Sequence, residues 1–468
     1  MYPKITTESS DNRLMNTLPA PSPVSLREAF WFWLKLGFLS FGGPAGQIAL
    51  MHQELVERKR WISEHRFLHA LNYCMVLPGP EAQQLATYIG WLMHRTWGGV
   101  VAGVLFVLPS LVLLIGLSWV YVRFGQVDWV AGLLYGIKPA VTAIVLQAAH
   151  RMGGRALRHP ALWALAIASF VAQFVFNLPF PAIIAAAAAI GWLMSRVRPA
   201  IFESIKAHAS AGAGSGEALI GDDTPRAAHT LFSIRRLALV IGVGAALWAL
   251  PMGALVLLWG WDQTLAQMAW FFTKAALLTF GGAYAVLPYV YQGAVEQFGW
   301  LTATQMIDGL ALGETTPGPL IIIVAFVGYL GGHASAVLGP DHLFAAGALA
   351  ACVVTWFTFL PSFLFILAGG PLVESTHNQL RLTAPLTAIT VAVVGVILNL
   401  TLFLSYHVFW PRGYNSLSWG GGVDGLALAI ACAAAVALLR YKRNVVEVIA
   451  VCALLGWLAR MAPVWMAG

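Results

Sequence analysis

The chain has 468 residues, of which 59% are hydrophobic and 10% are charged, and its mean hydropathy is +0.75. Because a soluble globular protein carries about a quarter charged residues, this composition excludes a soluble domain and predicts an integral membrane protein. The formal net charge of +7 is therefore interpreted through the placement of Lys and Arg among the loops, and we expect no nucleic-acid partner.

The sequence begins with a polar tail, residues 1–27, that is rich in Ser, Thr and Pro. It lacks a short apolar run followed by a small-residue cleavage site, so we expect no cleaved signal peptide. The four cysteines lie inside apolar runs without CxxC spacing, and the sequence contains no HExxH motif. We therefore expect no disulfide framework, no metal site and no cofactor.

Apolar runs of about 20 residues predict membrane-spanning helices, so the expected fold is an all-α polytopic membrane protein with about 13 of them. Six fall in a first domain, 28–195, which a polar Gly- and Ser-rich linker at 196–235 follows. One connecting helix at 236–262 then precedes a second domain, 263–468, with six more. The predicted spans in the two domains are 28–50, 67–92, 97–121, 128–149, 161–177 and 180–195, then 265–291, 304–330, 343–368, 384–409, 423–440 and 445–465.

The two domains contain an internal repeat. A shift of 239 positions, which carries Lys35 onto Lys274, aligns residues 35–80 with 274–319 without a gap and gives 13 identities in 46 positions. Composition alone accounts for roughly three to five identities in unrelated apolar sequence. The identities include Phe-Gly-Gly, a tryptophan and Pro-Gly-Pro, while the surrounding leucines and alanines differ. The repeat therefore preserves helix breaks more strictly than it preserves apolar residues.

Seven crossings separate equivalent points of the two repeats, and this odd number predicts that the repeats are inverted in the membrane. With the N-terminus in the cytoplasm and the C-terminus in the periplasm, about 17 Lys and Arg are cytoplasmic, about 7 are outside and 3 lie within spans. We expect this orientation in the cell inner membrane. One loop opposes it, because Arg58, Lys59, Arg60 and Arg66 fall on the outer side. Either residues 28–66 form a re-entrant hairpin, or the basic cluster attracts an anion.

Inverted repeats with interrupted helices at corresponding positions are typical of secondary transporters, whose substrate sites lie near the midplane. A helix cannot run through Pro-Gly-Pro but can begin after it, and helix N-termini bind anions. We predict substrate contacts at both kinds of break, unless the glycines only allow close helix packing. The predicted residues at the breaks are Ser40, Gly42, Gly43, Pro78, Gly79, Pro80, Thr279, Gly281, Gly282, Pro317, Gly318 and Pro319.

A charged side chain within a span is costly and is a functional candidate by default. Lys35 and Lys274 are equivalent by the repeat and are predicted to attract the substrate, although Lys35 is close enough to a helix end to reach the interface. Glu81 and Glu314 are the candidates for proton coupling, with helix capping as the alternative for Glu81. Further predicted donors near the breaks are Asn72, Gln83 and Thr316.

The motifs FGGP, LPGPEAQQLATYIG, TFGGAYAVLP and TPGPL resemble those of the chromate transporter family in its long form with two homologous halves. The resemblance covers nearly all of the membrane part, with Ala283 standing where a third glycine is expected. It implies export of chromate from the cytoplasm, driven by the proton-motive force, and chromate resistance. The expected partners are then chromate or a sulfate-like oxyanion, protons and the lipid bilayer. A homodimer is left open.

Two other functions compete with this interpretation. An anion channel has the same breaks and lysines but conducts without saturation and without alternating access. A membrane-embedded enzyme requires paired acids or metal ligands at an interface, which the sequence lacks, so we expect no enzyme. Because a dianion that leaves an inside-negative cell already gains energy from the membrane potential, we favour an antiporter in which protons enter on Glu314 or Glu81.

Overall fold

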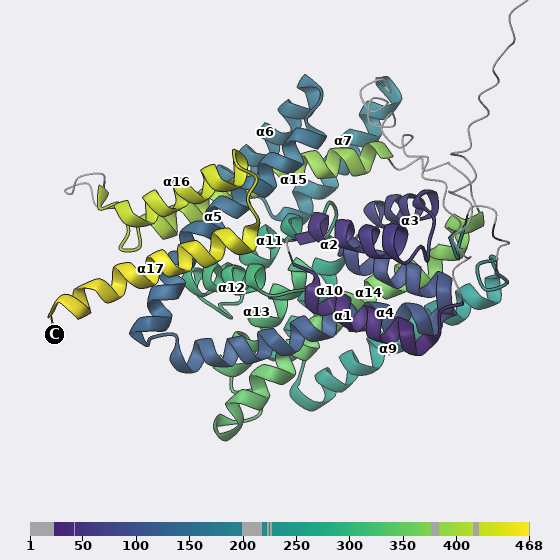
Figure 1. Ribbon diagram of the computed structural model, residues 1–468, viewed down its shortest axis with the longest axis horizontal. Helices are drawn as coiled ribbons and strands as arrows, with labels where there is room; N and C mark the ends of the chain where they lie inside the picture. The colour runs from purple at the N-terminus through teal and green to yellow at the C-terminus, as the bar shows by residue number, and fades with distance from the viewer. Residues whose placement is uncertain are drawn as a thin grey trace, which may run out of the picture.

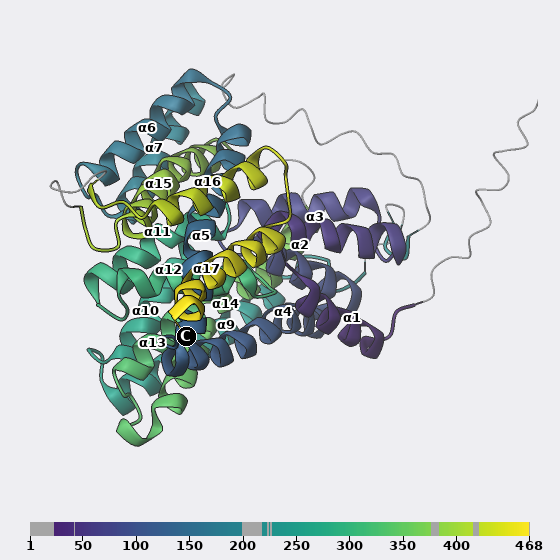
Figure 2. The ribbon, with the colours of Figure 1, turned by 60° about the vertical axis from the view of Figure 1, so that its left-hand side comes forward.

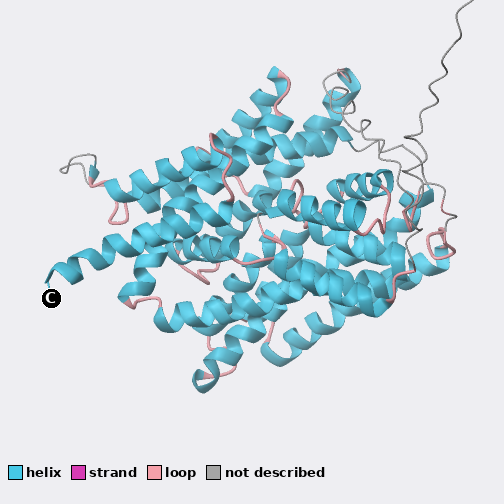
Figure 3. Cartoon of the chain, in the orientation of Figure 1, coloured by secondary structure: helices cyan, strands magenta, loops and turns pink. Residues whose placement is uncertain are grey.

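The structure is a computed structural model, and it describes residues 23–41, 43–198, 218–221, 224, 227–375, 383–414 and 421–467. These residues form helices and no strand (Figure 3), which confirms the all-α prediction. The helices of the first domain are α1 (Leu26–Leu39), α2 (Gly43–His52), α3 (Glu64–Val76), α4 (Glu81–Phe124), α5 (Asp128–Ala156), α6 (Pro160–Phe174) and α7 (Phe180–Val197). Those that follow are α9 (Ile234–Trp259), α10 (Thr264–Leu277), α11 (Ala283–Tyr291), α12 (Ala303–Thr315), α13 (Ile323–Ala334), α14 (Leu343–Ser375), α15 (Thr383–Phe409), α16 (Gly425–Leu439) and α17 (Val445–Ala467).

Among the described residues, six helices are long and apolar enough to cross a membrane, so the count of 13 is not confirmed. Four of the predicted spans consist instead of two short helices with a break between them. Residues 28–50 contain α1 and α2, 67–92 contain α3 and the start of α4, 265–291 contain α10 and α11, and 304–330 contain α12 and α13. Hydropathy alone does not separate one long helix from two short ones.

In the first repeat, α1 and α2 form a hairpin whose two ends lie together. The Lys59 ammonium, beyond α2, is 3.4 Å from the Glu28 carboxylate at the start of α1, and the rings of Phe32 and Trp61 are 4.8 Å apart. The linker packs beside these ends, because the Ile220 N–H donates to the Trp61 carbonyl at 3.0 Å. We call this side of the molecule the linker face. The hairpin alternative for residues 28–66 is the one that agrees with these contacts.

The second repeat has the same hairpins, but their ends lie at the other side of the molecule. The ring of Phe271, in the middle of α10, is 5.6 Å from that of Trp300, which lies beyond α11. The Thr264 hydroxyl donates to the Ser335 hydroxyl beyond α13 at 2.9 Å. We call this side the opposite face. Helix α9 joins the two faces, and its 26 residues span about 39 Å at 1.5 Å per residue.

A third turn of the first repeat lies within α4. His94 and Arg95 have non-helical backbone angles, and the chain folds back there so closely that a Cβ on Gly90 would lie 2.4 Å from the Gly98 carbonyl oxygen. The segment before this turn is a short helix from Pro-Gly-Pro to the linker face, where the His94 ring contacts the Val24 carbonyl at 2.8 Å. The segment after it is membrane-length. α13 and α14 repeat this arrangement from the opposite face.

The duplication extends to the local backbone. A π-helical turn follows α2 at Gln53–Arg58, and another follows α11 at Gln292–Gln297, which are the same positions after the shift of 239. Each turn is followed by a residue with positive φ, Arg60 or Gly299. Ser63 and Thr302 then accept the same N-cap hydrogen bond at the start of α3 and α12. Two sequences with few identities therefore encode one backbone path.

The remaining helices surround these hairpins. In Figures 1 and 2, α1 to α3 lie together at one end of the molecule, while α5, α16 and α17 form another group. Helix α17 packs along α5, α15 packs on α6 and α7, and α14 packs on α13. The largest buried cluster is apolar and includes α11, α12 and α13. The short helices of the second repeat are thus enclosed by longer helices.

Candidate functional site

The four helix breaks meet in the interior, and each repeat bonds to the other. The Gly79 N–H donates to the Thr279 carbonyl at 2.7 Å, and the Gly318 N–H donates to the Ser40 carbonyl at 2.7 Å. Under the repeat, Gly79 corresponds to Gly318 and Ser40 to Thr279. Each Pro-Gly-Pro break is therefore held by the Phe-Gly-Gly break of the other half, so the two halves share one central site.

The local sequence explains why the chain breaks here. Proline lacks an N–H and fixes φ, which ends a helix and allows the next one to begin. Gly79 and Gly318 have φ of +129° and +103°, a region that side chains disfavour. The chain enters the centre on α1, α3, α10 and α12 and leaves it on α2, α4, α11 and α13. Four helix N-termini therefore begin at the centre, and their free N–H groups favour an anion.

Two serines that the sequence reasoning missed support the breaks. The Ser110 hydroxyl in α4 donates to the Pro317 carbonyl at 2.5 Å, and the Ser362 hydroxyl in α14 lies 2.4 Å from the position that a Cβ on Gly79 would take. Both belong to a Leu-Pro-Ser sequence, so a shift of 252 positions carries Ser110 onto Ser362. This shift differs from the 239 positions that align the breaks, so an alignment at 239 does not match the two serines. The two occurrences of Leu-Pro-Ser were the feature of the sequence that could have identified the pair.

Several buried polar atoms near the breaks have no partner among the described residues. Gln47, 1% exposed, uses its amide N–H to donate to the Ser40 and Gly318 carbonyls, but its oxygen is unpaired. The side-chain oxygens of Gln83, Gln84 and Ser362 are unpaired as well. Buried polar atoms are normally satisfied by protein or water. Their concentration beside the breaks indicates a place where water or a polar ligand binds.

Two carboxylates also lie beside the breaks. Glu314, at the end of α12, accepts a hydrogen bond from the Tyr284 hydroxyl in α11 at 2.6 Å. Glu81 is half-buried and is the first residue of α4. Two exposed arginines of α5 act electrostatically on these carboxyl groups, Arg155 and Arg151 on Glu81 and Arg151 on Glu314. Tyr284 and Arg151 are additions to the predicted site, and Arg151 was overlooked because the predicted span ended at 149.

The other predicted site residues have varied positions. Thr316 is buried, and its hydroxyl donates to the Leu312 carbonyl at 2.7 Å, while the Gln83 amide donates to Thr87 at 3.1 Å. Gly43 begins α2, and Gly281 and Gly282 precede α11 with positive φ. Gly42 lies outside the described residues. Gly79 and Gly318 lie between their flanking prolines, Pro78, Pro80, Pro317 and Pro319.

The predicted cations are farther from the breaks than the glycines are. Lys35 is exposed on α1. The Lys274 ammonium lies 5.6 Å from the ring centre of Trp270, one turn earlier in α10. Asn72 is exposed on α3. These side chains therefore contact neither of the hydrogen bonds that join the repeats, and any role in attracting a ligand acts over a distance.

A buried ion pair joins the two halves away from the breaks. The Lys138 ammonium in α5 is 3.1 Å from the Asp308 carboxylate in α12, and the Tyr121 hydroxyl of α4 donates to the same carboxylate at 2.8 Å. Asp308 is 3% exposed. Lys138 looked isolated in the sequence because its partner is 170 positions away. The pair connects α12, which carries Glu314, to two helices of the first repeat.

Broken helices that meet between two inverted halves are typical of membrane transporters. The chain matches the family model described as "Chromate transporter" over residues 27–192 and 266–457. It belongs to the chromate transporter family. Among its relatives, a chromate transport protein of Pseudomonas aeruginosa is 34% identical and the match covers 94% of each chain. A chromate transport protein of Cupriavidus metallidurans is 29% identical, with 81% of this chain and 83% of the relative covered.

A probable chromate transport protein of Synechococcus elongatus is also 29% identical, over 81% of this chain and 84% of the relative. No solved structure matches the chain. The family and the apolar helices together establish a multi-pass membrane protein that belongs to a family of transporters.

Proposed function

We propose that this protein exports chromate from the cytoplasm across the cell inner membrane, uses the proton-motive force to do so, and confers chromate resistance. The observation that carries the proposal is the pair of hydrogen bonds between breaks, Gly79 to Thr279 and Gly318 to Ser40. These hydrogen bonds bring four helix N-termini to one place. The free N–H groups there can bind a tetrahedral dianion, because helix N-termini donate hydrogen bonds and favour negative charge. The predicted residues of the breaks bind the oxyanion, with Arg151 as a further cation.

The proposed orientation has the linker face in the cytoplasm, together with the N-terminus, and the C-terminus outside. With the hairpin ends on the linker face, Arg58, Lys59, Arg60 and Arg66 become cytoplasmic. The number of cytoplasmic Lys and Arg then rises from about 17 to about 21, and the number outside falls from about 7 to about 3. This distribution agrees better with the positive-inside rule. The basic loop around residues 58–66, which opposed this orientation, then agrees with it.

Uptake of labelled chromate into everted membrane vesicles tests the function, because the cytoplasmic face is then outside. We expect saturable uptake that requires the protein and an energised membrane, with cells that express the protein growing at higher chromate than cells with an empty vector. Sulfate is the competing substrate to include. Uptake of sulfate alone indicates a different oxyanion transporter, and a flux that never saturates indicates an anion channel. Either result contradicts the proposal.

A further inference from the structure

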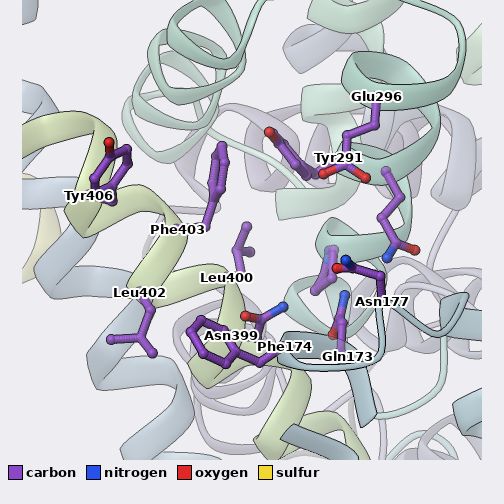
Figure 4. Close-up of a pocket in the computed structure, with 12 residues that line it drawn as sticks. Gln173, Phe174, Asn177, Tyr291, Glu296, Asn399, Leu400, Leu402, Phe403 and Tyr406 are labelled. Carbon is purple, nitrogen blue, oxygen red and sulfur yellow. The ribbon is translucent and has the colours of Figure 1, made fainter. Parts of the chain in front are cut away.

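A cavity of about 420 Å³ opens at the opposite face between α6, α11 and α15. Among its lining residues Asn177 and Glu296 are exposed, and Gln173 and Pro288 are buried. Figure 4 shows Gln173, Asn177 and Glu296 around the cavity. Residues 292–297 form the π-helical turn after α11. The cavity is therefore built on the outer end of the second repeat's hairpin and is separate from the residues at the breaks.

The lining determines which ions the cavity accepts. Among the described residues that line it, the charged one is Glu296, and none is Lys or Arg. The other polar groups are carboxamides and tyrosine hydroxyls, from residues such as Asn399 and Tyr291. One carboxylate without a cation attracts positive charge and repels a dianion. The oxygen of Gln173, a residue 5% exposed, has no partner, and a polar cavity of this size holds water that satisfies it.

Helix α11 connects the cavity to the buried carboxylate. Tyr284, Pro288 and Tyr291 recur at helical spacing on one side of α11. Pro288 and Tyr291 line the cavity, and the Tyr284 hydroxyl donates to Glu314 at 2.6 Å. Because Pro288 has no N–H, the Tyr284 carbonyl lacks its helical partner and remains free to accept a bond from water. The cavity and the Tyr284–Glu314 hydrogen bond therefore lie on the same side of α11, two helical turns apart.

We propose that this cavity is a water-filled proton intake from the opposite face, in which Glu296 gathers protons that travel along α11 to Glu314. The proposal rests on the proposed export function. A proton leaves bulk water, is carried by the cavity water and protonates the Glu314 carboxylate. Tyr284 of α11 donates to Glu314, and the exposed Arg151 of α5 acts on it electrostatically. Tyr291 interacts electrostatically with Glu296, and the ring of His407 in α15 lies tilted against that of Phe403 in the lining, with the ring centres 4.0 Å apart.

The test replaces Glu296 by cysteine in a chain whose four native cysteines are substituted. Intact cells are treated with an impermeant methanethiosulfonate that carries either a sulfonate or a quaternary ammonium, and everted vesicles are then prepared. We expect Glu296→Cys to lower the uptake driven by a pH gradient at least fivefold. The sulfonate, which restores a negative charge, should return at least half of it, and the ammonium should return none. Uptake driven by potential alone should change less than twofold.

The matched control is Glu57→Cys, because Glu57 occupies the same repeat position on the linker face and its side chain is 59% exposed. Neither reagent should alter its uptake. Equal effects of the two reagents on Glu296→Cys, or no effect of the substitution, overturn the proton intake. So does potential-driven chromate uptake that never responds to a pH gradient in the unsubstituted protein. If chromate uptake is absent under every gradient, it is the proposed function that fails.

Discussion

At the scale of single residues, Gly318 combines two constraints. Its φ of +103° disfavours any side chain, and a Cβ there would lie 1.7 Å from the Ser110 hydroxyl, so the serine must abandon its bond to Pro317. We expect Gly318→Ala to lose stability by about 1–3 kcal/mol and to lower chromate uptake at least tenfold. Thermal unfolding in detergent and vesicle uptake measure the two effects.

The control for this prediction is Gly253→Ala in α9, where an added Cβ meets nothing within 4 Å. Alanine favours a helix over glycine by roughly 0.5–1 kcal/mol, so this variant should unfold at the same or a higher temperature. Unchanged uptake and stability in Gly318→Ala would mean that the break adapts to a side chain, and that its geometry does not matter for transport.

The Lys138–Asp308 pair allows a second test at this scale. Removing one partner of a buried ion pair leaves an uncompensated charge and costs about 3–5 kcal/mol, while removing both is often nearly neutral. We therefore expect Asp308→Asn and Lys138→Met each to destabilise the protein, and the double variant to regain most of its stability and uptake. A double variant that is stable but inactive would instead assign Asp308 a direct part in transport.

At the scale of elements, the hairpins allow a test of which side of the membrane each repeat faces. Arg58 and Gln297 are exposed, occupy the same position of the two repeats and end the two π-helical turns. If each repeat's hairpins enter from its own face, Arg58→Cys reacts with an impermeant thiol reagent only from the cytoplasm, and Gln297→Cys reacts only from outside. Labelling of both from one side would exclude inverted hairpins.

The elements also explain what the sequence allowed to be predicted. The breaks were predictable because Pro-Gly-Pro and Phe-Gly-Gly act on their own backbone. The sidedness of residues 28–66 was not, since α1 and α2 together are as long and apolar as one spanning helix. Ser110, Gln47 and Asp308 were missed because their partners lie far away in the chain. Such contacts depend on how helices pack and leave no local pattern.

At the scale of the whole molecule, the backbone is duplicated but the carboxylates beside the breaks are not. The shift of 239 positions carries Met75 onto Glu314 and Ala45 onto Tyr284, while Glu81 is carried onto Leu320. The helix N-termini that favour an anion therefore come from both halves, and the hydrogen-bonded carboxylate comes from the second half alone. The proposed oxyanion site therefore treats the two halves alike, and we expect any direction of transport to depend on the carboxylate that one half supplies.

The direction can be tested from the energetics of a dianion. Each charge that moves through 100 mV gains about 2.3 kcal/mol, so a dianion leaving an inside-negative cell gains about 4.6 kcal/mol, or roughly 2,000-fold accumulation. Potential alone should therefore drive chromate into everted vesicles, and an acidic lumen should accelerate it if protons move in exchange. We expect uptake by Glu314→Gln to stop responding to the pH gradient, because its amide cannot accept a proton. Uptake that ignores both the potential and the pH gradient would contradict electrogenic export.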